Sequence, residues 1–145
     1  MKDNTLDSVY LPLKIAFGLV PLLAGLDKFV GLLADWESYL SPQIAALLPC
    51  SPAAFMKLVG VIEILVGLAI LTWLPRLGAY LAMAWLVLIV LDLLLARRFD
   101  IAVRDLTLAV GAYSLGTLAG LKGLAWLPDF SHQPAELETH AQRRS

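Results

Sequence analysis

An acidic residue, Glu63, stands in the middle of an otherwise apolar stretch, Gly60-Val-Ile-Glu-Ile-Leu-Val-Gly67. A carboxylic acid at the centre of a membrane-spanning helix costs roughly 3 kcal/mol, whereas each Leu, Ile, Val or Phe contributes roughly −0.3 to −0.6 kcal/mol. The apolar neighbours outweigh the acid, so the segment can still enter a membrane. An acid that insertion tolerates but does not need is a candidate functional group.

Other charged residues stand near the ends of the apolar segments. At a rise of ~1.5 Å per residue, Lys28 and Asp92 should both lie ~6–8 Å inside the membrane face opposite the chain termini, and Lys14 should lie equally far inside the other face. Opposite charges at one level can neutralise each other, so we expect Lys28 and Asp92 to face each other or to share a cavity. A structural ion network with snorkelling side chains is the alternative. The residues of the expected polar pocket are Glu63, Lys28, Lys14, Asp92, Arg104 and Asp105.

The depth of Glu63 predicts its chemical state. The same estimate places it ~15 Å from either face, with no cation at its level. We therefore expect Glu63 to be unpaired, and either neutral or bound to a water or a ligand. A neutral acid can both donate and accept a hydrogen bond, which suits a quinone carbonyl or a proton relay.

The composition is that of an integral membrane protein. The chain has 145 residues, is 59% hydrophobic and has a mean hydropathy of +0.77, whereas soluble domains are roughly 45–50% apolar. About 20 apolar residues cross the hydrocarbon core, so the long apolar runs predict spans at about 9–33, 53–74, 76–96 and 104–127. With short connections, residues 1–127 should form a single all-α domain, an antiparallel four-helix bundle.

Two segments lie outside these spans. Residues 34–52 contain Trp36 and Tyr39, which suit the lipid headgroup zone, and predict a short interfacial segment between the first two spans. Residues 128–145 form a polar tail that need not fold. The distribution of Lys and Arg favours cytoplasmic termini for a multi-pass protein of the cell membrane.

Several classes of function are disfavoured. A net charge of −1 gives no strong attraction to nucleic acid. The single cysteine, Cys50, excludes an internal disulfide and a CxxC redox pair. Both histidines, His132 and His140, fall in the polar tail, so the spans offer no haem, zinc or iron–sulfur constellation and we expect no metal site and no intrinsic cofactor.

The order of several motifs resembles the DoxX family of small four-helix membrane proteins. These motifs are Lys14, then Gly25-Leu-Asp-Lys28, then Gly60-x-x-Glu63-x-x-x-Gly67, then Arg76 at the start of the third helix. The resemblance covers roughly residues 10 to 125. Members commonly have Arg near position 14, and the Lys found here loses the bidentate hydrogen bonding of Arg.

The resemblance implies a role beside a redox enzyme. Relatives are linked with quinone-dependent oxidation of sulfur compounds, with membrane oxidoreductase complexes and with membrane-protein assembly, and of their positions Lys28 and Glu63 match well enough to carry over. We expect an accessory or quinone-binding subunit that works with a membrane oxidoreductase partner or as a homo-oligomer in the bilayer, and that is not an enzyme on its own.

Two alternatives remain open. The chain could carry protons or a small polar solute, with Glu63 titrating in the core. It could instead be an assembly or structural factor that grips other spans through the small residues of the last helix, which are Ala109, Ala112, Gly116 and Ala119.

Overall fold

The computed structural model describes residues 2–127, and this part of the chain contains five α-helices, one short 3-10 helix and no strand. The expected all-α class is confirmed. The polar tail expected at 128–145 lies outside the described residues. The elements are α1 (Lys2–Val30), the 3-10 helix η1 (Trp36–Tyr39), α2 (Pro42–Leu47), α3 (Pro52–Leu71), α4 (Pro75–Leu95) and α5 (Phe99–Leu121).

Three helices of the described chain are long and apolar enough to cross a membrane. They are the part of α1 from Thr5 to Val30, α3 and α4. Helix α5 has 23 residues, but its first two turns carry Asp100, Arg104 and Asp105. It is therefore not among the helices that are apolar enough to cross a membrane. The observed helices support a membrane protein with three clear candidate spans.

The ends of the helices follow from local sequence. Ser41 and Ser51 each cap a helix that starts with proline, and their hydroxyl oxygens accept hydrogen bonds from the backbone N–H groups of Ile44 and Ala54. Helix α1 ends at Val30 rather than at the expected residue 33, because Gly31 adopts a positive φ of 72° and turns the chain.

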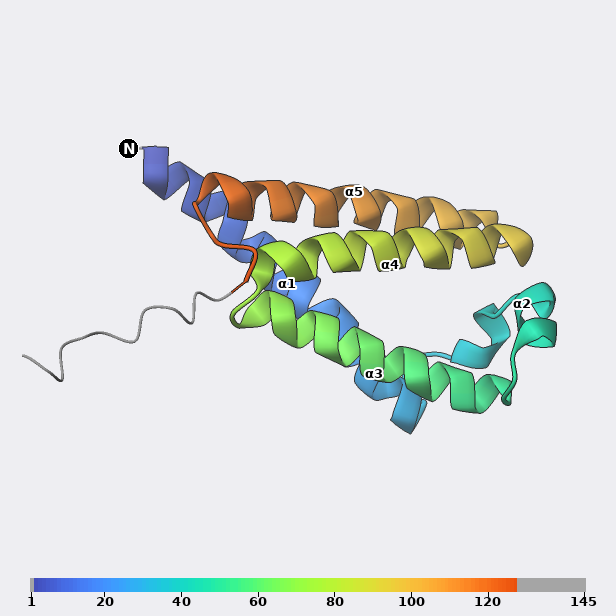
Figure 1. Cartoon of the computed structure of the whole chain (residues 1–145). Coiled ribbons are helices and arrows are strands. Elements are labelled where there is room, and N and C mark those ends of the chain that lie inside the picture. Colours follow the sequence, from blue (N-terminus) through green and yellow to red (C-terminus); the bar gives the residue numbers. More distant parts are fainter. Residues whose placement is uncertain (1, 128–145) are drawn as a thin grey trace, which may run out of the picture.

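Helices α1 and α3 lie side by side in very close contact, and α4 and α5 form a second pair (Figure 1). A Cβ added at Gly25 would lie 2.6 Å from the carbonyl oxygen of Gly60, and a Cβ added at Gly67 would lie 2.6 Å from that of Gly18. Both contacts are between backbones, which explains why glycine stands at all four positions.

The α4–α5 pair buries the small face of α5. Ala109, Ala112, Gly116 and Ala119 are all buried, and the ring of Tyr80 on α4 covers Gly116. The small residues that the alternative of an assembly factor assigned to contacts with other spans therefore pack within this chain.

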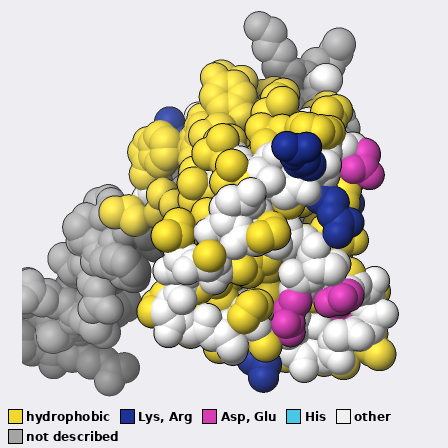
Figure 2. Space-filling model, turned by 90° about the vertical axis from the view of Figure 1, so that its right-hand side faces the viewer, with side chains coloured by type: hydrophobic (Ala, Val, Ile, Leu, Met, Phe, Trp, Pro, Cys, Tyr) yellow, Lys and Arg dark blue, Asp and Glu magenta, His cyan; other side chains and the backbone are white. Residues whose placement is uncertain are grey.

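The two ends of the helix assembly differ. The N-terminus, the α3–α4 turn and the end of α5 lie together at one end, whereas η1 and α2 lie at the other (Figure 1). We call these the terminal end and the loop end. Seen from the loop end, side chains of both charges are set among apolar ones (Figure 2).

Candidate functional site

The centre of the candidate site is an ion pair between α1 and α3. The Nζ atom of Lys28 lies 2.5 Å from Oε2 of Glu63, and the two side chains expose only 3% and 10% of their surface. The expectation that Glu63 has no cationic partner is wrong. The aliphatic part of the Lys28 side chain places the ammonium closer to the membrane centre than the Cα atom of Lys28.

Gly60 makes room for this reach. A Cβ added at Gly60 would lie 3.1 Å from the Cβ of Lys28, so the lysine stem starts where α3 has no side chain. Glu63 follows Gly60 by three residues, which places it on the same face of α3 about one turn further along. The lysine can therefore run along α3 to the carboxylate without displacing the helix.

The indole of Trp36 covers the lysine on its other side. The Nζ atom of Lys28 lies 3.7 Å from the ring centroid of Trp36, a cation–π contact. Asp27 fixes this indole, since Oδ2 of its buried carboxylate accepts a hydrogen bond from Nε1 of Trp36 at 2.7 Å. The same carboxylate also accepts from the backbone N–H groups of Leu32 and Leu33. The sequence had placed Trp36 only at the headgroup level, and had left Asp27 out of the site.

Helices α4 and α5 close the site around Glu63. The buried carboxylate of Asp105 lies near enough to Glu63 to act on it electrostatically, and Arg104 holds that carboxylate with Nε at 2.8 Å from Oδ1. The indole Nε1 of Trp85 also lies close to Glu63, but it is buried without a hydrogen bond of good geometry. Residues from α1, α3, α4, α5 and η1 thus meet at one carboxylate.

Two of the expected pocket residues lie elsewhere. Asp92 accepts hydrogen bonds from the hydroxyl and the backbone N–H of Ser41, at 2.5 and 3.1 Å, and so ties the loop segment to α4. The expected pairing of Lys28 with Asp92 is wrong, because Glu63 takes the lysine and Ser41 takes the aspartate. Lys14 lies half-buried on α1, about 21 Å from Lys28 along the helix axis, and does not belong to this site.

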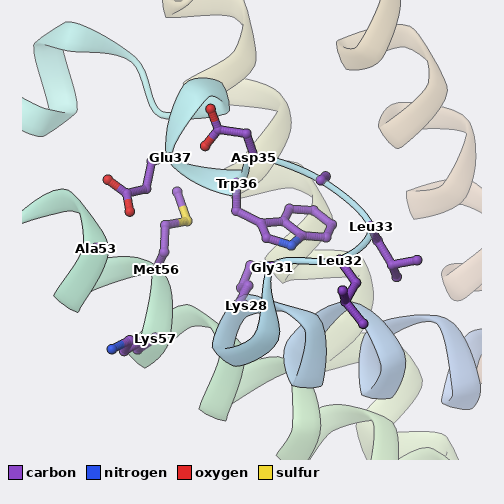
Figure 3. A pocket seen from close by; sticks show the side chains of 11 residues that line it. Lys28, Gly31, Leu32, Leu33, Asp35, Trp36, Glu37, Ala53, Met56 and Lys57 are labelled. Atoms are coloured by element: carbon purple, nitrogen blue, oxygen red, sulfur yellow. The ribbon is translucent and has the colours of Figure 1, made fainter.

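A hollow of about 460 Å³ opens beside the ion pair at the loop end. It is lined by the loop residues 31–35 and by Lys28, Trp36, Glu37, Ala53, Met56 and Lys57. Figure 3 shows the Trp36 indole across the end of α1 near Lys28, and the Lys57 side chain pointing away from the indole. The site therefore combines a flat aromatic wall, a flexible thioether and a buried ammonium.

No protein family, curated protein or solved structure matches this chain in searches of all three kinds. Within residues 2–127, no group of three or more His, Cys, Asp and Glu side chains is placed to hold a metal ion. The chemistry of the site is that of a lysine ammonium whose position is set by one carboxylate and one indole.

Proposed function

We propose that the chain is a DoxX-like membrane protein in which α1, α3, α4 and α5 all cross the bilayer as an antiparallel bundle. Two features support a spanning α5. It packs along α4 over its whole small face, and Asp105, one of the charges in its first turns, is buried against Arg104 and the Glu63 site rather than presented to lipid.

We further propose that the hollow at the loop end binds the head group of a quinone. One observation carries this proposal, namely that Lys28 belongs both to the buried ion pair and to the wall of the hollow. A ligand in the hollow therefore lies beside a lysine whose ammonium the protein already holds in place.

The hydrogen-bonding capacity of Lys28 supports a carbonyl ligand. An ammonium has three N–H donors, of which Glu63 accepts one and the π face of Trp36 attracts the charge. A donor remains for a quinone carbonyl, and the indole offers a flat surface for the quinone ring. The volume of the hollow lies within the range of about 300–1,000 Å³ that is usual for small-molecule sites.

The energetics of the ion pair also favour a functional role. Desolvation of two buried charges roughly cancels their attraction, so an apolar pair of similar volume would serve stability at least as well. A ligand, rather than folding, then accounts for the presence of Lys28 and Glu63 at this depth.

In this proposal the chain is an accessory subunit. It binds and orients the quinone, and a membrane oxidoreductase partner exchanges electrons with it. The small residues of α5 are buried within this chain, and the proposal does not use them to bind other spans.

The test is a binding titration with decylubiquinone and the purified protein in nanodiscs. Quinones quench indole fluorescence, and Trp36 lies on the wall of the hollow, so we expect saturable quenching that Trp36→Phe largely removes. Lys28→Met should weaken binding about tenfold, the loss expected for one hydrogen bond to a charged donor.

The matched control is Arg97→Met, because Arg97 is an exposed cation of the α4–α5 loop. Quenching that does not saturate, or equal affinity for the Lys28→Met variant and the wild type, would rule the proposal out.

A further inference from the structure

A second group of cations lies at the terminal end, away from the proposed quinone site. Lys122 follows α5 and pairs with Asp7 on α1, and its Nζ atom lies 5.4 Å from the ring centroid of Tyr10. Lys14 stands one turn after Tyr10 along α1. Arg76, at the start of α4, packs against Gly120, two residues before Lys122.

Positive charge is in excess at this end. Lys14, Arg76 and Lys122 stand against a single acid, Asp7, among the side chains that the structure describes there. Asp7 is already engaged by Lys122. The described part of the chain thus gives Arg76 and Lys14 no carboxylate partner.

The guanidinium of Arg76 is held in a fixed orientation. Its Cζ atom lies 4.0 Å from the ring centroid of Trp126, and Trp126 stacks on Tyr80 with centroids 5.2 Å apart. Gly120 leaves space for the group, since a Cβ added there would lie 3.3 Å from both Nε and Cζ. The Nε atom is buried and has no hydrogen-bond partner in the described chain. Arg76 is therefore an oriented planar donor for which the described residues supply no acceptor.

The aromatic residues around Arg76 indicate the level of the lipid head groups. Trp73, in the α3–α4 turn, is 83% exposed, and Trp126 is 47% exposed. Tryptophan is enriched where the bilayer meets water, because its ring is apolar and its N–H is polar. Arg76 follows Trp73 by three residues, so it lies at the depth where lipid phosphates lie.

We propose that Arg76 binds the phosphate group of an anionic phospholipid at the terminal end. A guanidinium binds phosphate through two parallel N–H donors, and stacking on Trp126 presents its edge for that contact. Basic pockets between spanning helices bind anionic head groups in this way.

The test is native mass spectrometry of the protein released from micelles that contain equal amounts of palmitoyl-oleoyl phosphatidylglycerol and palmitoyl-oleoyl phosphatidylcholine. We expect the wild type to retain phosphatidylglycerol in preference to phosphatidylcholine. Arg76→Gln should lower the retained phosphatidylglycerol about tenfold, and Arg76→Lys, which keeps the charge but loses the planar fork, should lower it less. Arg97→Gln, the exposed cation at the loop end, should leave retention unchanged.

A second arm separates lipid from free phosphate. Inorganic phosphate in large excess should neither displace phosphatidylglycerol nor raise the melting temperature of the lipid-free protein. If inorganic phosphate does both, the site binds the free anion and the assignment to a lipid is overturned. Equal retention of the two lipids by the wild type, or unchanged retention in both Arg76 variants, would overturn the site itself.

Discussion

At the scale of single residues, the site depends on a lysine that reaches further into the membrane than its position in the sequence indicates. The sequence places the Cα atom of Lys28 near one membrane face and that of Glu63 near the membrane centre. The pair forms because the lysine stem bridges that difference in depth alongside Gly60, where α3 has no side chain. A depth estimate made from Cα positions cannot predict this contact, because the contact depends on the register between the two helices.

The two partners of this pair should be strongly coupled in stability. Removal of one partner leaves the other charge buried and unpaired, so Lys28→Met and Glu63→Leu should each cost about 3–5 kcal/mol of unfolding free energy. The double variant should be much less unstable than the sum, since it leaves no buried charge. Reversible unfolding in mixed detergent micelles measures all three values.

An exposed acid provides the control for this cycle. Asp100→Leu, in the first turn of α5, should change stability by less than about 0.5 kcal/mol. Additive losses from Lys28→Met and Glu63→Leu would mean that the two side chains do not interact.

At the scale of helices, the sequence indicated which residues face protein but not what they meet. Gly18 and Gly25 lie seven residues apart on one stripe of α1, and each meets a glycine of α3 across the antiparallel crossing. The loop segment was harder to predict, because the bond between Ser41 and Asp92 joins residues 51 positions apart. Nothing local to either residue specifies that contact.

Close backbone contact makes Gly25 intolerant of even one methyl group. In Gly25→Ala the new Cβ would lie 2.6 Å from a backbone carbonyl, so α1 and α3 must separate, at a cost of about 1–3 kcal/mol. The matched control is Gly111→Ala on α5, where the nearest atom is the tip of the Phe17 ring, which can move. Melting temperatures of the two variants in the same detergent decide the point, and an equal loss for both would contradict the close α1–α3 contact.

The loop segment should be held over the hollow mainly by Ser41. Ser41→Ala removes both hydrogen bonds of the serine hydroxyl. One is the cap of α2, accepted from the N–H of Ile44 and typically worth about 1 kcal/mol, and the other is the bond to Asp92. Hydrogen exchange should therefore rise across η1 and α2 while α3 and α4 stay protected. Ser51→Ala is the matched control, because Ser51 also caps a helix that starts with proline but makes no bond to Asp92. Similar exchange patterns in both variants would show that the bond to Asp92 does not hold the segment.

At the scale of the whole molecule, the all-helical class and the membrane character could be predicted from apolar run length alone. The gathering of charges at the loop end was expected from their depths along the helices, whereas the partner of each charge could not be predicted, because it depends on which helices pair. Lys28, Glu63 and Asp105 come from three helices and meet near the loop end, whereas Arg76 packs on Gly120 at the terminal end. Helix pairing thus turns scattered charges into two separate polar sites.

The number of crossings decides where the end of α5 lies relative to the membrane. If α5 spans, residues at the terminal end share one side, and the loop end faces the other. The native Cys50, which is exposed, and Arg97→Cys in a Cys50→Ser background should then react with a membrane-impermeant maleimide from outside intact cells. Thr72→Cys and Leu127→Cys in the same background should react only after the cells are opened, because the balance of Lys and Arg favours a cytoplasmic terminal end.

Both Thr72 and Leu127 are exposed, so a lack of labelling would not reflect burial in the protein. Labelling of Leu127→Cys from the same side as Arg97→Cys would show that α5 does not cross, and the terminal end would then be formed by α1, α3 and α4 alone.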